Sequence, residues 1–158
     1  MKIERAVLKR ALRCALLAFI VCTLVFIFVN SMIPTEKSAE ISGGVGGFLA
    51  GIISPDTPLG AFLQRYIRKI AHFTEYGFLG AEIALYIFFF CKEKRKYASN
   101  SAFLPFLVGF IDESVQLISK RGASVLDVWI DAFGFIFFSL IAYALLFGVR
   151  FIIYSVKK

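Results

Sequence analysis

Four long apolar runs, separated by short charged or glycine-rich stretches, divide the chain. A helix needs about 20 mostly apolar residues to cross the hydrocarbon of a bilayer, whereas a strand of a membrane barrel needs about half of that. The pattern therefore predicts an all-α membrane protein with four transmembrane helices. They are expected at about residues 12–32, 71–91, 101–118 and 128–148.

The composition supports this class. The chain has 158 residues, of which 59% are hydrophobic and 16% aromatic. A soluble domain is usually about 45–50% apolar, so this chain has too few polar residues to coat a soluble core. The length corresponds to about one domain. We predict a single transmembrane domain that spans residues 1–158.

The positions of the basic residues predict the orientation. A cytoplasmic N-terminus places twelve of the 18 Lys and Arg residues on the inside, in residues 1–13, 91–101 and 149–158. Loops rich in Lys and Arg stay in the cytoplasm, so both termini are expected there. The net charge of +7 is then explained by this topology and by the attraction of the inner basic segments to anionic lipid. Because the basic residues are divided among these segments, we expect no nucleic-acid partner.

The loop between the first two predicted helices, residues 34–67, lies outside in this topology. Two sets of apolar residues recur in and just after it at helical spacing: Ile41, Val45, Phe48, Leu49 and Ile52, and then Leu59, Phe62, Leu63, Tyr66, Ile67 and Ile70. This spacing predicts short amphipathic helices on the membrane surface. The alternative is a surface loop that only connects the two helices.

Charged residues occupy one face of the second apolar run, which begins within the stretch RKIAHFTEYGFLG (residues 68–80). Arg68, His72, Glu75 and Glu82 align on a helix because steps of three and four residues stay on one face. A charge in hydrocarbon costs about 3 kcal/mol or more on insertion scales. These side chains are therefore expected to face other helices, although the sequence names no partner for Glu82.

The third and fourth runs carry a second polar set. Asp112, Glu113 and Gln116 lie near the end of the third run, and Asp127 and Asp131 lie at the start of the fourth. The predicted topology brings both sets to the outer level of the membrane, where the charged face of the second run also begins. We predict one polar, water-accessible pocket that opens to the outer face.

Several of these residues also have simpler explanations. Asp127 follows Ser124 by three residues, which is the spacing of a capping box. Arg68, Lys69 and His72 are also suited to anchoring a helix at the head-group level. A purely structural network of ion pairs is a further alternative for the whole set.

Three motifs in this order, RKIAHFTEYGFLG, DESVQ and RGASVLDVWIDAFG, resemble the VanZ-like family of small bacterial membrane proteins. The resemblance covers about residues 65–140. It implies importance for twelve residues: Arg68, Lys69, His72, Glu75, Tyr76, Asp112, Glu113, Gln116, Arg121, Asp127, Asp131 and Gly134. The family more often has Asn where this chain has Asp131, so an additional carboxylate here favours a cation.

The main functional hypothesis combines this resemblance with the predicted pocket. Founding members of the family are linked to resistance to glycopeptide antibiotics such as teicoplanin. We expect a multi-pass protein of the bacterial cytoplasmic membrane with a role in the cell envelope. The implied residues other than Gly134 would bind an anionic membrane lipid, a lipid-linked cell-wall precursor or an amphiphilic glycopeptide. Arg68, Lys69 and Arg121 would hold phosphate or carboxylate groups.

This hypothesis requires no metal ion or other cofactor, and it leaves a homodimer open. One alternative is a membrane-embedded enzyme that acts on a lipid-linked substrate. Its candidate catalytic residues are His72, Glu75, Asp112 and Glu113, with His72 as general base or with the cluster, including Asp131, binding a divalent metal ion. The single histidine excludes a His-rich zinc site. Another alternative is an ion-coupled transporter that uses Glu82 and the other carboxylates as a relay.

Overall fold

The computed structural model describes residues 2–119 and 124–156 and contains no β-strand among them. These residues form six helices: α1 (Lys2–Met32), α2 (Thr35–Ala50), α3 (Pro58–Phe90), α4 (Lys94–Ser101), α5 (Leu104–Ile118) and α6 (Val125–Val156). Within the described parts of the chain, four helical stretches are long and apolar enough to cross a membrane: Ala6–Met32, Pro58–Phe90, Lys94–Ile118 and Val125–Val156. The predicted all-α chain with four such stretches is confirmed.

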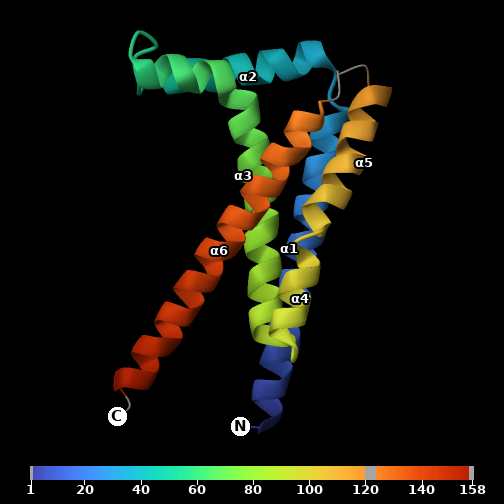
Figure 1. The fold of residues 1–158 in the computed structure, drawn as a ribbon, viewed down its shortest axis with the longest axis vertical. Helices are drawn as coiled ribbons and strands as arrows, with labels where there is room; N and C mark the ends of the chain where they lie inside the picture. The colour runs from blue at the N-terminus through green and yellow to red at the C-terminus, as the bar shows by residue number, and fades with distance from the viewer. Residues whose placement is uncertain (1, 120–123, 157–158) are drawn as a thin grey trace.

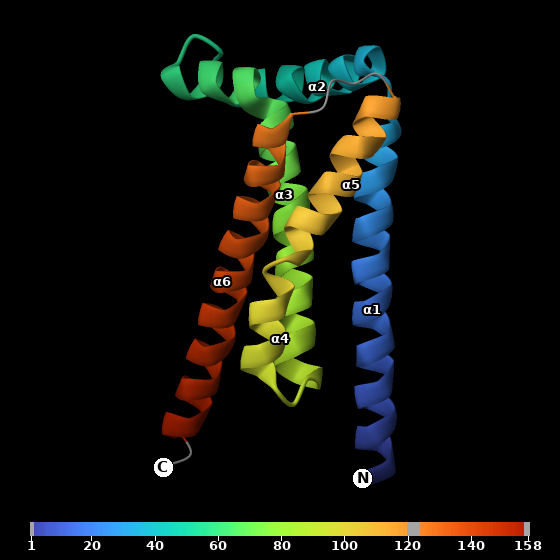
Figure 2. The ribbon, with the colours of Figure 1, turned by 45° about the vertical axis from the view of Figure 1, so that its right-hand side comes forward.

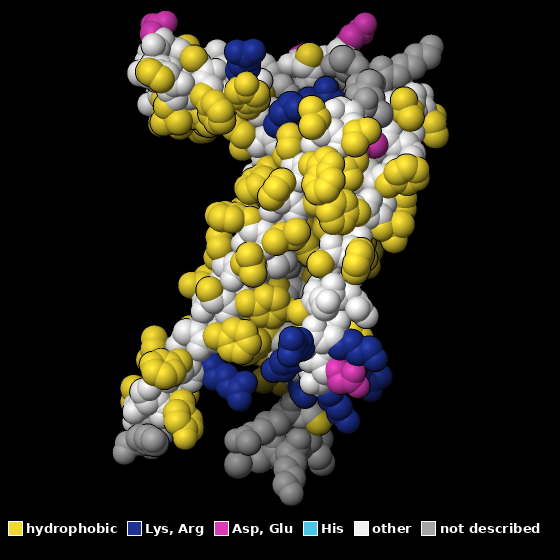
Figure 3. Space-filling view, viewed as in Figure 1, with side chains coloured by type: hydrophobic (Ala, Val, Ile, Leu, Met, Phe, Trp, Pro, Cys, Tyr) yellow, Lys and Arg dark blue, Asp and Glu magenta, His cyan; other side chains and the backbone are white. Residues whose placement is uncertain are grey.

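The helices form an upright bundle with α2 lying across one end (Figures 1 and 2). Both termini lie at the opposite end of the bundle. Apolar side chains cover the middle of the face shown in Figure 3, and Lys and Arg side chains gather towards its two ends. This distribution suits a bilayer, because the apolar middle meets hydrocarbon and the charged ends meet head groups.

The start of α3 differs from the sequence prediction. Residues 59–70 do not form a separate surface helix, because α3 is one helix from Pro58 to Phe90. Thr57 caps this helix: the Gly60 backbone N–H donates a hydrogen bond of 3.0 Å to Thr57 Oγ1. Pro58 is favourable in the first turn because its missing N–H needs no partner there. Figure 1 shows the first turns of α3 beside α2, before the helix turns down into the bundle.

The third crossing also differs, since it begins at Lys94 and is broken between α4 and α5 rather than running unbroken over residues 101–118. Pro105 lies in the first turn of α5 and lacks the N–H that would bond to the carbonyl of Ser101. Ala102 and Phe103 instead donate to carbonyl oxygens three residues earlier, each at 3.3 Å. The proline therefore accounts for the break.

The most extensive helix contact joins α3 and α6, and glycines permit their close approach. A Cβ atom on Gly134 would lie 2.2 Å from the backbone oxygen of Phe73, and one on Gly80 would lie 2.2 Å from that of Phe135. Any larger side chain would separate the two backbones. This contact brings Asp131 of α6 next to His72 of α3. The fourth helix is also longer than predicted and continues to Val156.

Candidate functional site

The centre of the candidate site is a group of three buried side chains from three helices. His72 Nδ1 of α3 lies 3.6 Å from Asp131 Oδ1 of α6 and 3.9 Å from Asp112 Oδ2 of α5. One ligand atom from each residue lies within 4.8 Å of the other two. Both aspartates are fully buried, and His72 is 4% exposed. The imidazole is therefore placed between two carboxylates that have no access to solvent.

Asp112 is held by two hydrogen bonds. The hydroxyl of Ser31 in α1 donates to Asp112 Oδ1. Gln116 Nε2, one helical turn further along α5, donates to Asp112 Oδ2 at 3.1 Å. These bonds fix the orientation of the carboxylate, so its position opposite His72 is predefined by the fold.

Gln116 also connects the buried group to Glu113 and to Arg68, which lies at the exposed edge of the site. Its Nε2 donates to Glu113 Oε1 at 3.3 Å, and its Oε1 accepts a bond of 3.2 Å from Arg68 Nη2. Gln116 is fully buried, whereas Arg68 is partly exposed. The amide thus bridges the arginine on α3 and the carboxylates on α5.

Glu113 has a structural contact that its sequence position did not reveal. Its Oε2 accepts a hydrogen bond of 2.7 Å from the backbone N–H of Ser124, the residue before α6 begins. A carboxylate at this place satisfies an otherwise unpaired N–H at a helix start and interacts favourably with the helix dipole. Glu113 therefore caps α6 from a neighbouring helix.

Lys69 and Asp127 form an ion pair at the edge of the site. The Lys69 Nζ to Asp127 Oδ1 distance is 3.2 Å, and the two side chains are 44% and 18% exposed. The backbone N–H of Asp127 bonds to the carbonyl oxygen of Ser124, while its side chain is occupied by the lysine. This arrangement joins α3 to the start of α6.

Glu75 and Tyr76 extend the site along α3. Asn30 Nδ2 of α1 donates a hydrogen bond of 2.8 Å to Glu75 Oε1. The Tyr76 side chain is fully buried, and its hydroxyl has no hydrogen-bond partner in residues 2–119 and 124–156.

A cavity of about 200 Å³ adjoins the group and lies between α1, α2 and α3. We name it the α2 cavity. Its polar lining comprises Asn30, Ser38, Ser42, Arg68, His72 and Glu75, and its apolar lining comprises Phe26, Ile41, Val45, Ile67 and Ala71. Arg68, His72 and Glu75 of the predicted pocket line this cavity, whereas Tyr76, Asp112, Gln116 and Asp131 are buried behind it.

The structure unites ten of the eleven predicted binding residues in one network or along its edge, and Arg121 lies outside the described residues. Sequence reasoning missed the contribution of α1. Asn30 and Ser31 are adjacent polar residues at the end of the first apolar run, which was the available signal. It also left Glu82 without a partner, and the structure supplies Thr23 of α1, whose hydroxyl donates to Glu82 Oε1 at 2.9 Å.

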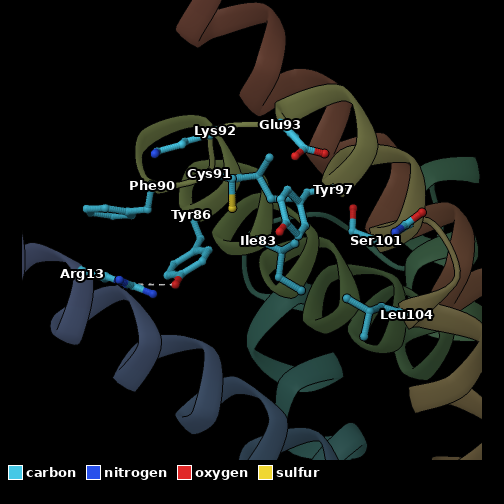
Figure 4. A pocket seen from close by; sticks show the side chains of 12 residues that line it. Arg13, Ile83, Tyr86, Phe90, Cys91, Lys92, Glu93, Tyr97, Ser101 and Leu104 are labelled. Atoms are coloured by element: carbon cyan, nitrogen blue, oxygen red, sulfur yellow. Dashed lines mark hydrogen bonds between the residues drawn. The ribbon is translucent and has the colours of Figure 1, made fainter.

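A larger cavity, of about 720 Å³, lies near the end of the bundle that holds the termini. Figure 4 shows Arg13 beside Tyr86 in this cavity, and Arg13 Nε donates a hydrogen bond of 3.0 Å to the Tyr86 hydroxyl. Lys92 and Glu93 also line it. None of the predicted site residues that the structure describes lines this larger cavity, so it is not part of the candidate site.

No curated protein and no solved structure matches the chain. The family model described as VanZ/LLP1 matches residues 16–148, which include every predicted site residue, all of α3 and α5, and most of α6. The chain therefore belongs to the VanZ/LLP1 family.

Proposed function

We propose that this protein binds the anionic head group of a membrane lipid or of a lipid-linked cell-wall precursor in the α2 cavity. One observation carries the proposal: a polar cavity with an arginine and a histidine on its wall lies beneath a helix that crosses the end of a membrane bundle. This is the level at which a bilayer presents its phosphate groups.

Arg68 is the residue suited to the anion. A guanidinium carries five N–H donors in a planar fork and forms paired hydrogen bonds with phosphate. Gln116 accepts a bond from one of these donors, which orients Arg68 and leaves capacity for an anion. Asn30 and Ser42 add amide and hydroxyl groups on the cavity wall.

The lining of α2 supports access from the membrane. Ile41 and Val45 border the cavity and are about half exposed, and Phe48, further along α2, is 71% exposed. An amphipathic helix with such residues lies in the interfacial plane of a bilayer. In the proposed arrangement α2 covers the bound head group, and the acyl chains remain in the surrounding lipid.

The volume of the cavity limits the size of the ligand that it can hold. Pockets for drug-sized ligands have volumes of about 300–1,000 Å³, whereas the α2 cavity measures about 200 Å³. It suits a phosphate head group and is too small for an entire glycopeptide antibiotic. We propose that any teicoplanin resistance arises through the lipid or precursor that the protein binds. Comparing teicoplanin susceptibility of host cells that express Arg68→Ala or the wild-type chain tests this connection.

The direct experiment measures lipid binding by the purified protein in neutral detergent, using native mass spectrometry. Phosphatidylglycerol and undecaprenyl phosphate represent the two lipid sources, and phosphatidylcholine is the zwitterionic comparison. A hydrogen bond to a charged group contributes about 1.5–3 kcal/mol, so Arg68→Ala should weaken binding of the preferred anionic lipid by about 10–100-fold.

Arg65→Ala is the matched control. Arg65 lies one turn before Arg68 on α3, is exposed, and has its guanidinium carbon 5.7 Å from the centre of the Tyr66 ring. It does not line the α2 cavity. Binding should change less than about twofold in this variant. Equal losses in the two variants would show that general charge attraction, rather than the cavity, binds the lipid.

A membrane-embedded enzyme is the second candidate, and the position of His72 between Asp112 and Asp131 favours it. A carboxylate that orients an imidazole is a recurring feature of general-base catalysis. Incubation with radiolabelled undecaprenyl phosphate or phosphatidylglycerol, followed by chromatography of the lipid products, tests for turnover. Product formation that disappears in His72→Gln would support an enzyme, and the absence of turnover would leave the binding function.

A further inference from the structure

We propose that His72, Asp112 and Asp131 bind a divalent ion of a first-row transition metal beside the α2 cavity. The three residues come from α3, α5 and α6, which meet at the buried end of the polar network. The cation site rests on its own geometry. Only the role of the cation towards a phosphate head group rests on the proposed function.

The distances between the three side chains suit a shared ion. Two ligand atoms that each lie about 2.1 Å from one ion are about 3.0–3.4 Å apart in octahedral or tetrahedral geometry, and up to about 4.2 Å apart on opposite sides. His72 Nδ1 lies 3.6 Å from Asp131 Oδ1 and 3.9 Å from Asp112 Oδ2. Both separations exceed a normal hydrogen bond and lie between the values for neighbouring and for opposite ligands, so small shifts of the side chains bring them onto one ion.

The charges also favour a cation. Asp112 and Asp131 are both fully buried, and an unpaired carboxylate in such a place costs several kcal/mol. A protonated His72 supplies one positive charge to two carboxylates. Arg68 bonds to Gln116 and Lys69 bonds to Asp127. A divalent ion bound by neutral His72 and both aspartates balances the charge of the group.

Unsatisfied polar atoms provide an independent observation. Both carboxylate oxygens of Asp131 lack a hydrogen-bond donor among the described residues. The Tyr76 hydroxyl, one helical turn after His72 on α3, is also buried and lacks a hydrogen-bond partner there. Buried polar groups are almost always hydrogen-bonded, so the Asp131 oxygens and the Tyr76 hydroxyl point to a bound ligand that contacts them. A hydrated ion supplies both positive charge and water molecules.

The surroundings of Asp112 resemble those of a metal ligand. Ser31 and Gln116 donate to its two oxygens and fix its orientation, as outer-shell groups do for ligating carboxylates. Gly109 of α5 faces Asp131, since a Cβ atom on this glycine would lie 3.4 Å from Asp131 Oδ2. The lack of a side chain at Gly109 keeps space beside this carboxylate.

The ligand types limit the identity of the ion. One imidazole and two carboxylates suit Mn²⁺ or Zn²⁺ better than Ca²⁺, which prefers six to eight oxygen ligands. Three protein ligands leave at least one coordination position open. Because His72 also lines the α2 cavity, a phosphate oxygen of the proposed head group has access to that position. The cation would also offset the charge of Glu75 when an anion binds there.

The experiment uses the full-length protein in detergent, stripped of metal ions with EDTA and then titrated with Mn²⁺. Free Mn²⁺ is measured by electron paramagnetic resonance, and bound metal is measured by elemental analysis after desalting. We expect one ion per chain. Asp131→Asn should weaken binding by more than about 100-fold, beyond the 10–100-fold effect of losing an outer-shell group.

Glu82→Gln is the matched control. Glu82 is another intramembrane carboxylate of α3, bonded to Thr23 and outside the group of three. The Mn²⁺ affinity of the Glu82→Gln protein should stay within about twofold of that of the wild type. Helical circular dichroism and gel filtration check the fold of each variant, and His72→Gln replaces Asp131→Asn if the latter aggregates. Less than about 0.2 ion per wild-type chain, or unchanged affinity in the folded ligand variant, would overturn the site.

Lipid binding measured with and without Mn²⁺ separates the two proposals. Stoichiometric Mn²⁺ binding without any effect of Arg68→Ala on lipid would leave the cation site and remove the proposed function. Lipid binding that depends on Arg68, with no Mn²⁺ bound, would leave the proposed function and remove the cation site. If Mn²⁺ strengthens lipid binding in the wild type but not in Asp131→Asn, the ion acts on the bound head group.

Discussion

Ser31 at the end of α1 donates a hydrogen bond to Asp112 in α5, and both side chains are buried. Nearby, the Ser119 hydroxyl donates a bond of 3.2 Å to the backbone oxygen of Ser31. These contacts fasten the first helix to the third crossing beside the candidate site. They make α1 a part of the site, although the family motifs lie in the later helices.

Ser31→Ala should therefore destabilise the protein. The change leaves one oxygen of buried Asp112 without its donor, and a lost hydrogen bond to a charged group costs about 1.5–3 kcal/mol. The measurement is thermal unfolding in detergent. Ser114→Ala is the control, because the Ser114 hydroxyl donates a hydrogen bond to the Phe110 carbonyl of its own helix and not to a neighbouring helix among the described residues. If both variants unfold at the same temperature, the contact between Ser31 and Asp112 contributes no stability.

Gly134→Ala should weaken the packing of α3 against α6. The added Cβ atom would approach the Phe73 backbone oxygen to 2.2 Å, so the helices must separate, at a typical cost of about 1–3 kcal/mol. Gly148→Ala makes the same change on α6 where nothing lies within 4 Å. Thermal unfolding should distinguish the two variants. A Gly134→Ala protein as stable as Gly148→Ala would contradict the close approach of these helices.

The ion pair of Lys69 and Asp127 should contribute little to stability. Lys69 is nearly half exposed, and exposed ion pairs typically contribute about 0.2–1 kcal/mol. Lys69→Met should lower the unfolding free energy by less than about 1 kcal/mol, and exchanging the two charges (Lys69→Asp with Asp127→Lys) should restore most of the loss. A larger loss that the exchange does not restore would show that Lys69 has another partner.

The placement of both termini in the cytoplasm is testable by cysteine labelling in intact cells. Cys14, Cys22 and Cys91 are first replaced by Ala, and single cysteines are then introduced as Glu40→Cys in α2 or Arg95→Cys in α4. Both positions are exposed. A membrane-impermeant maleimide should label the α2 cysteine and spare the α4 cysteine until the cells are opened. The reverse pattern would invert the topology.

The sequence was sufficient to indicate four membrane-spanning helices and to select the polar residues within them. Apolar runs of about 20 residues are long enough to cross a bilayer, and charges within such runs are expected to face other helices. That reasoning selected Arg68, His72 and Asp112, which the structure joins through Gln116 and the buried group. The helix limits were predicted less accurately. Helix α3 begins at the Thr57 cap, so the predicted surface segment is its first part, and Pro105 interrupts the third crossing.

The pairing of side chains between helices was decided by the tertiary structure alone. Periodicity shows which residues share a face of one helix, but it does not fix the rotation or height of one helix against another. Close backbone contact at Gly80 and Gly134 sets that relation for α3 and α6, and so places Asp131 beside His72. The same packing uses Glu113 to cap α6 and brings Ser31 to Asp112. The sequence by itself determined that carboxylates lie within long apolar stretches, and the packing of the helices determined which group each carboxylate faces.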